Sequence, residues 1–145
     1  MTQDVRFSRD VSGDMLLPLQ AKLDGGAGAA MLIRLYDGTR PATPETAITT
    51  QTKLSQSASS NTTTCATETP TGTLTFASIP TVTAETFTSP STRTATWARW
   101  CMSDGTPVFD CDVGTVGSGA FIEMVSTSVV SGAPVAFSSA TITMP

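Results

Sequence analysis

The run TATWARWCMSDGTPVFDCDVGTVGSG, residues 94–119, constrains the fold more than any other part of this sequence. Asp104-Gly105 is a typical two-residue hairpin loop, because both residues tolerate a positive φ. With this loop, Ser103 lies opposite Thr106, and alternate side chains of the two strands share one face. That face is almost wholly apolar and carries Ala98, Trp100, Met102, Pro107, Phe109 and Cys111.

The opposite face of this hairpin supplies a second argument for the same register. Arg99 lies directly across from Asp110, so the sequence predicts a cross-strand ion pair. A shift of one residue would bury Arg99 and expose Trp100, which makes other registers unfavourable. The stretch therefore predicts an all-β packing unit.

The N-terminal residues predict the only helix. Residues 1–13 are expected to form an extended arm, in which Val5 and Phe7 alternate with polar residues. The sequence DMLLPLQAKLD, residues 14–24, predicts a helix that Asp14 caps and that Gly25-Gly26 ends. Three leucines recur at helical spacing, at positions 16, 19 and 23, so we expect this face to lie on the sheet; the alternative is a partner-binding helix.

Short Thr-rich runs separated by turn residues predict the remaining strands. Residues 55–72 are nearly free of large apolar side chains and are expected to form a long surface loop with room for a short edge strand. The predicted strands are 29–36 (central in the sheet), 48–54, 73–79, 81–87, 94–102, 106–112, 120–125 and 134–144. This pattern predicts an antiparallel β-sandwich, jelly-roll or immunoglobulin-like, formed by a single domain over residues 14–145.

The composition excludes several classes of partner. The net charge is −4, and the eight basic residues are scattered singly, which argues against nucleic-acid binding. The N-terminus has no apolar signal-peptide core, and no run approaches the roughly 20 apolar residues of a membrane span. We therefore expect a protein made in the cytoplasm with no membrane partner. Ser and Thr make up about 30% of the chain and charged residues only 14%, which favours a protein packed against copies of itself or another partner.

Reactive side chains are few. The chain has no histidine, which excludes Ser-His-Asp and Cys-His catalysis and His-bearing metal sites. Cys101 and Cys111 fall on opposite faces of the hairpin and should not pair. We interpret all three cysteines as buried thiols; the alternatives are a disulfide from Cys65 to one of the others and a three-thiolate metal site. No enzyme activity and no cofactor are expected.

Other candidate sites have simpler structural explanations. Asp104, Asp110 and Asp112 could supply an acid pair or a calcium site, but one lies in a turn and another faces Arg99. GTVGSG, residues 114–119, lacks the lysine and helix of a phosphate loop and is expected to form a hairpin or bend. Trp97 could be a platform for stacking sugars.

Three stretches together carry a resemblance to a known group of proteins. They are LIRLYDGTRPATPET, TATWARWCMSDGTPVFDCDVGTVGSGAFIEM and SGAPVAFSSATITMP, and the similar region covers roughly residues 15–145. In this order they resemble small virion proteins of tailed bacteriophages and prophages. The cysteines and the Ser/Thr-rich loop depart from that pattern.

The resemblance implies a non-enzymatic structural role in the virion. We expect a capsid decoration or cement protein that bridges the major capsid protein and copies of itself as a homo-oligomer. The alternatives are a tail or baseplate component and, in a different class, a carbohydrate-binding module. The expected contact residues are Val5, Phe7, Val11 and Trp97.

Overall fold

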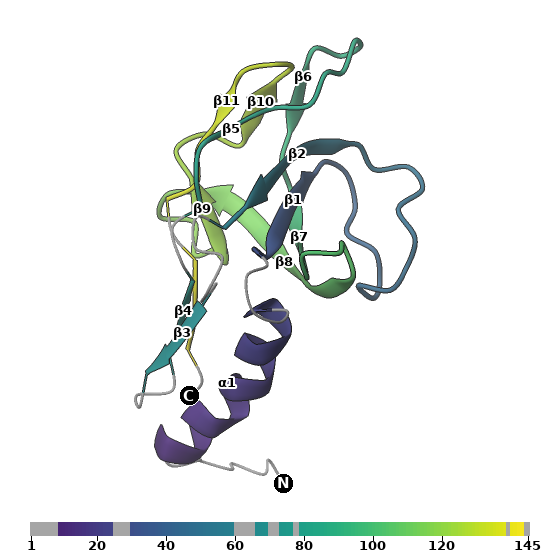
Figure 1. Cartoon of the computed structure of the whole chain (residues 1–145). Helices are drawn as coiled ribbons and strands as arrows, with labels where there is room; N and C mark the ends of the chain where they lie inside the picture. Colours follow the sequence, from purple (N-terminus) through teal and green to yellow (C-terminus); the bar gives the residue numbers. More distant parts are fainter. Residues whose placement is uncertain are drawn as a thin grey trace, which may run out of the picture.

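The computed structural model describes residues 9–24, 30–59, 66–69, 73–76, 79–138 and 140–143. The chain is mostly β, with one N-terminal helix (Figure 1). The elements are α1 (Arg9–Asp24), β1 (Leu32–Tyr36), β2 (Lys53–Ala58), β3 (Ala66–Thr69), β4 (Thr73–Phe76), β5 (Val82–Thr83), β6 (Thr92–Thr94), β7 (Trp97–Cys101), β8 (Pro107–Thr115), β9 (Ile122–Met124), β10 (Ser128–Val130), β11 (Pro134–Val135) and β12 (Thr141–Thr143).

The main sheet has five strands in the order β2-β1-β7-β8-β9. All neighbours are antiparallel except β8 and β9, which are parallel. This mixed sheet curls into a half-barrel (Figure 1). It does not form a clear two-sheet sandwich, so the prediction of an antiparallel sandwich is corrected to a mostly β fold with a mixed main sheet. Irregularities in register between Leu35 and Tyr36 and between Trp100 and Cys101 contribute to the curl, because bulges bend and twist a strand.

The predicted hairpin register is confirmed over most of its length. Arg99 pairs with Asp110 and Trp100 with Phe109, as the sequence implies. The loop differs: the Gly105 amide donates to the Met102 carbonyl, and the Met102 amide donates to the Thr106 carbonyl. Gly105 has a φ of 89°, and no residue other than glycine has a positive φ in the described part of the chain. The loop therefore has three residues, a turn followed by a left-handed glycine, and this shifts the last pair by one residue.

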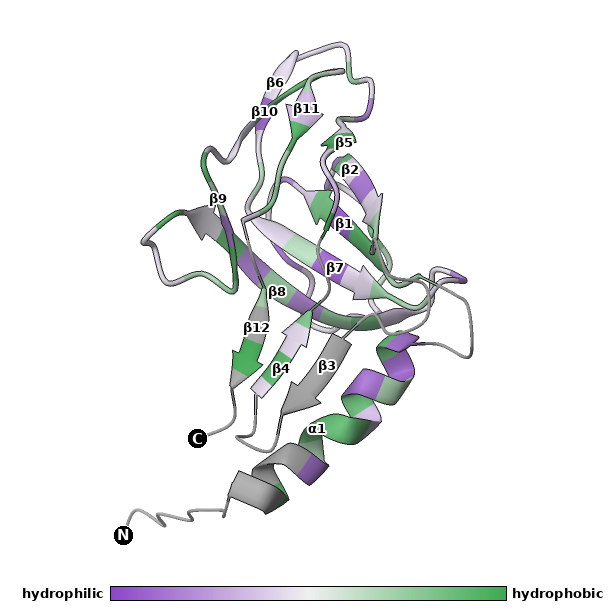
Figure 2. Cartoon of the chain, turned by 60° about the vertical axis from the view of Figure 1, so that its left-hand side comes forward, coloured by the Kyte–Doolittle hydropathy of each residue, from purple (hydrophilic) through white to green (hydrophobic). Residues whose placement is uncertain are grey.

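Smaller sheets flank the half-barrel on two sides. Two ribbons, β10-β6 and β11-β5, lie at one end of the molecule, and the three-stranded sheet β12-β4-β3 lies at the other. α1 contacts β3 and β4 there (Figures 1 and 2). Leu16 and Leu23 are buried and Leu19 is half-buried, which confirms that the predicted leucine face lies on the sheet.

α1 ends at Asp24 as expected but begins at Arg9, five residues earlier than predicted. Residues 9–13 are therefore helical, and the expectation of an extended arm is wrong for them; residues 1–8 lie outside the described residues. Pro18 is inside the helix rather than near its first turn. Pro18 and Gly13 have poor helix propensity, and the packing of the leucine face on β3 and β4 compensates for it.

Several strand boundaries also differ from the prediction. β1 is central, as expected, but β2 begins at Lys53 and continues into residues 55–72, where the sequence predicted a loop with room for a short edge strand; β2 and β3 are both edge strands. Three serines of this segment, Ser55, Ser57 and Ser59, are buried. Serine is small enough to face a packed core without overfilling it, so the lack of large apolar residues did not exclude burial. β10 was not predicted, and the predicted last strand is divided into β11 and β12.

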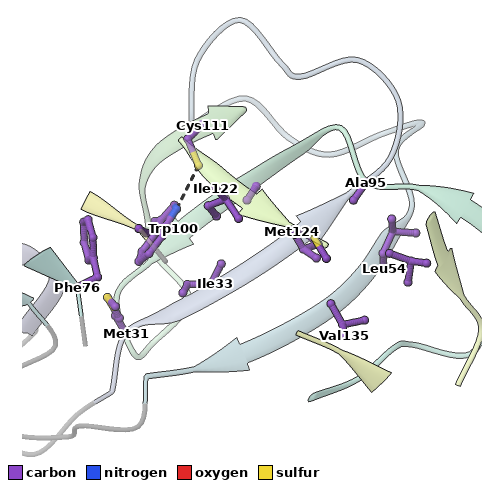
Figure 3. Close-up of a cluster of buried hydrophobic side chains, with 14 of the residues drawn as sticks. Met31, Ile33, Leu54, Phe76, Ala95, Trp100, Cys111, Ile122, Met124 and Val135 are labelled. Atoms are coloured by element: carbon purple, nitrogen blue, oxygen red, sulfur yellow. Dashed lines mark hydrogen bonds between the residues drawn. The ribbon is translucent and has the colours of Figure 1, made fainter. Parts of the chain in front are cut away.

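One core joins the helix, the half-barrel and the flanking sheets. Trp100 lies at its centre, stacked on Phe109 with ring centroids 5.4 Å apart and packed edge-on against Phe121 at 6.0 Å. Figure 3 shows the Trp100 indole pointing at Cys111, with Phe76 and Met31 beside it. The indole nitrogen donates to the Cys111 sulfur at 3.2 Å, so this buried N–H has a hydrogen-bond partner.

Candidate functional site

The densest group of polar side chains lies on the outer face of the main sheet. Arg99 and Asp110 form a two-pronged ion pair, with both N–O distances 2.8 Å, and both side chains are buried. Arg99 also donates to the Thr46 carbonyl at 3.2 Å, so the loop between β1 and β2 covers the pair. The hydrogen bond that Arg99 donates to Asp110 raises the pKa of Arg99, and burial opposes that shift. The pair fastens a loop to the sheet and leaves no carboxylate free for chemistry.

Trp97 lies beside this ion pair, inside the protein. Its ring stacks on Tyr36 with centroids 4.5 Å apart, and the Arg99 guanidinium lies 5.4 Å from its centroid. Its indole N–H donates to the Asp37 carbonyl at 3.2 Å. Trp97 is only 1% exposed, so it is neither a contact residue nor a sugar platform in this structure, contrary to the expectation. Burial also raises the pKa of Tyr36.

The other two aspartates hold turns rather than a ligand. The Asp104 carboxylate accepts from the Thr106 amide at 2.8 Å, and this bond lowers the pKa of Asp104. Asp112 accepts from the Phe121 amide at 3.1 Å. Within the described ranges, no group of three His, Cys, Asp or Glu side chains could hold a metal ion.

The glycine-rich segment 114–119 forms a bend, one of the two predicted alternatives, and not a hairpin. It connects β8 to β9, which are parallel, so it is not a hairpin turn. Gly117 and Gly119 have positive φ, and Gly119 donates to the Glu123 carboxylate at 3.0 Å. A Cβ at Gly114 would collide with Ser118 Oγ and lie 2.9 Å from Ala120 Cβ. The segment is a tight structural crossover, in which close packing requires glycine at 114 and a positive φ favours glycine at 117 and 119.

The two described cysteines are buried, free thiols on opposite faces of the hairpin, as predicted. Burial raises the pKa of Cys111 to about 12 and also raises the pKa of Cys101. Neither thiol is available as a nucleophile at neutral pH, because the thiolate is the reactive form. Cys65 lies outside the described residues.

Exposed apolar side chains lie mainly at two places; a further one, Val116, is 63% exposed in the loop between β8 and β9. The first, which we call the helix end, consists of Val11 and Met15 of α1, which are 43% and 48% exposed; Leu17, 46% exposed, is two residues from Met15 and therefore lies on another side of the helix. The second, the ribbon end, consists of Val125 and Val130, of which Val125 is 87% exposed. α1 and the ribbons lie at opposite ends of the molecule in both views (Figures 1 and 2).

A shallow pocket of about 180 Å³ opens at the ribbon end. Its walls are mainly apolar and come from β9, β10, β11 and the segments beside them: Met124, Val125, Ser126, Ser128, Val129, Pro134, Val135 and Ala136. None of these side chains is charged, so the pocket suits one apolar side chain of a partner better than a polar substrate.

Of the four contact residues expected from the sequence, Val11 is exposed on α1, Trp97 is buried, and Val5 and Phe7 lie outside the described residues. The ribbon end was not anticipated. Val125 and Val130 lie in a short stretch rich in Ser and Thr, and only the fold shows that both are exposed.

No protein family model, curated protein or solved structure matches this chain. In the part of the chain that the structure describes, no helix is long and apolar enough to cross a membrane.

Proposed function

We propose that this chain is a structural protein of a tailed-phage virion, and specifically a decoration protein that joins neighbouring capsid subunits. The observation that carries the proposal is the presence of two separate apolar contact surfaces, the helix end and the ribbon end, at opposite ends of a small protein. A bridging protein needs two such surfaces, whereas an enzyme needs a cleft with reactive groups. The resemblance of the sequence to small phage virion proteins supports the same function.

The chemistry of the described residues agrees with a binding role. The polar side chains of Arg99, Asp110 and Asp104 are engaged in holding the loops and the hairpin. The low content of charged residues, 14%, reduces the cost of desolvating a contact surface. Apolar side chains buried at the centre of a contact would then provide most of the binding free energy.

The decisive measurement is the location of the chain in separated phage parts. Particles of the phage that encodes it are split into heads and tails, and each fraction is quantified by mass spectrometry. We expect the chain in the head fraction, in a copy number comparable to that of the major capsid protein. Recovery only with tails would instead support a tail or baseplate component, and absence from both fractions would refute a virion role.

A second measurement tests the contact surface. Heads stripped of the protein are mixed with the purified chain or with Val125→Asp, and bound protein is separated from free protein by sedimentation. A charge at the ribbon end should abolish retention while leaving the melting temperature unchanged, because Val125 is 87% exposed. Equal retention of both proteins would show that the ribbon end makes no contact with the capsid.

A further inference from the structure

α1 carries two apolar stripes, and the sheet covers only one of them. Leu16, Leu19 and Leu23 face β3, β4 and the core. Val11, Met15 and Pro18 form a second stripe at spacings of four and three residues, and all three are exposed. Lys22 continues this stripe four residues further on and is exposed as well. At 3.6 residues per turn, spacings of four, three and four residues place these side chains along one line of the helix, as in the seam of a coiled coil.

The two ends of this second stripe carry opposite charges. Asp14, which is exposed, borders the N-terminal half of the stripe, and Lys22 closes its C-terminal half. When two such helices pack antiparallel, the acidic side chain of each lies near the basic side chain of the other. In a parallel pair, Asp14 would face Asp14 and Lys22 would face Lys22, which repel each other.

We propose that this stripe is the contact between two copies of the chain, with their α1 helices antiparallel about a twofold axis between Met15 and Pro18. Met15 then packs on Pro18 of the second copy, and Val11 packs on the aliphatic stem of Lys22 of the second copy. Asp14 is three residues from Val11, about 4.5 Å along the helix axis, so the ammonium of that lysine can reach it. The twofold axis repeats each contact, which gives four apolar contacts and two ion pairs.

A single pair of helices buries less surface than a standard interface of about 1,600 Å². We therefore expect a reversible dimer with a dissociation constant between about 1 µM and 1 mM. The inference does not depend on the proposed virion role, because it concerns the purified chain alone. Failure to dimerise would leave the head-and-tail fractionation unaffected, and the reverse also holds.

The first test is sedimentation equilibrium of the purified full chain over that concentration range, with Met15→Glu and Leu17→Glu as a matched pair. Both residues are on α1 and are almost equally exposed, 48% and 46%, but only Met15 is on the stripe. Met15→Glu should weaken the dimer at least about tenfold, whereas Leu17→Glu should leave it within about twofold. A wild-type chain that stays monomeric, or equal effects of the two variants, would refute the proposal.

The second test uses charge exchange, which does not rely on the fold tolerating Glu at position 15. Asp14→Lys and Lys22→Asp should each weaken self-association at least about tenfold, because each places like charges opposite one another. An equimolar mixture of the two variants should dimerise like the wild type, since every reversed charge then meets its complement. A mixture that stays as weakly associated as the separate variants would exclude the antiparallel pairing.

Discussion

Ser55 is an uncommon residue for the interior of a sheet, because its hydroxyl has no partner. Its side chain is buried on β2, and Ser55 Oγ makes no hydrogen bond. Ser57, two residues along the same strand, is buried too, but its hydroxyl donates to the Pro80 carbonyl at 3.2 Å. A comparison of the two serines therefore distinguishes the free-energy cost of burying a hydroxyl from the stabilisation that its hydrogen bond provides.

We predict opposite effects for the two alanine substitutions. Ser55→Ala removes an unsatisfied hydroxyl and should leave the free energy of unfolding unchanged or raise it by up to about 1 kcal/mol. Ser57→Ala removes a hydrogen bond and should lower it by about 0.5–1.5 kcal/mol. Urea unfolding measures both, and a loss of stability in Ser55→Ala equal to that in Ser57→Ala would contradict the prediction.

The buried thiol of Cys111 predicts how stability depends on alkaline pH. Burial raises the pKa of Cys111 to about 12 in the folded chain, against about 8.5 for an exposed cysteine. Below about pH 8.5 the thiol is protonated in both states, so its contribution to stability is fully present. As the pH rises from there towards 12, only the unfolded chain releases the proton, and the contribution is lost.

We therefore expect the free energy of unfolding to fall above about pH 9, by up to about 1.4 kcal/mol per pH unit for each such group. Cys111→Ala should reduce this slope although it lowers stability at neutral pH. Urea titrations at pH 7.5, 9 and 10.5 measure the slope. A slope that is the same in the wild type and in Cys111→Ala would assign the effect to Cys101 and Tyr36, whose pKa values burial also raises.

Among the elements, the connection between β8 and β9 is the most unusual. Parallel neighbours are normally joined by a crossover of a dozen or more residues, whereas here Thr115 and Ile122 are separated by only six residues. The short loop folds back against Gly114, where a side chain would meet Ser118 and Ala120. The absence of a Cβ at Gly114 is therefore what allows the parallel pairing.

Gly114→Ala should destabilise the protein by about 1–3 kcal/mol, because the added methyl group overpacks this loop. The nearest obstacle is the Ser118 side chain, so adding Ser118→Gly should recover part of the loss. Urea unfolding of the single and double variants measures the recovery. An undiminished loss in the double variant would indicate that the Ala120 contact, at 2.9 Å, dominates instead.

The elements that the sequence predicted well are those whose signals are local. The hairpin register follows from the position of Gly105 and from the alternation of Trp100 and Phe109 with polar residues. The start of α1 and the course of β2 depend on packing against distant segments, which cancels the poor helix propensity of Gly13 and the low hydrophobicity around Ser57. The parallel β9 could not be inferred, because a Gly-rich turn after a strand ordinarily indicates a hairpin.

The candidate contact surfaces show the same limit at the scale of the whole molecule. Val11 was predicted to be a contact residue and is exposed, whereas Trp97 was predicted to be one and is buried by the loop after β1. That loop is some fifty residues away from Trp97 in the sequence, so no local pattern could indicate that it covers the ring.

At this scale the continuous core predicts cooperative unfolding. Leu23 of α1 is fully buried in the cluster that also contains Trp100 of the half-barrel. Leu23→Ala should therefore cost about 2–5 kcal/mol and shift the urea transition equally by tryptophan fluorescence, which reports on β7, and by far-UV circular dichroism. Leu17→Ala, at an exposed position of the same helix, should change stability by less than about 0.5 kcal/mol.

Different shifts in the two signals would argue against this prediction. A fluorescence transition that stays in place while the circular dichroism signal changes would show that α1 and its sheet unfold separately from the half-barrel.

Each edge strand of the half-barrel has a backbone carbonyl that is hydrogen-bonded to a neighbouring segment. The Leu54 carbonyl on β2 accepts from the Glu85 amide at 2.7 Å, and the Glu123 carbonyl on β9 accepts from the Ser138 amide at 3.1 Å. An open strand edge would recruit any extended chain through its backbone, whatever the sequence of that chain. These two carbonyls are already bonded within the molecule, so neither is open to the backbone of an added strand. A chain that binds beside them would have to be recognised through side chains, and surface substitutions would then change that recognition without altering the sheet.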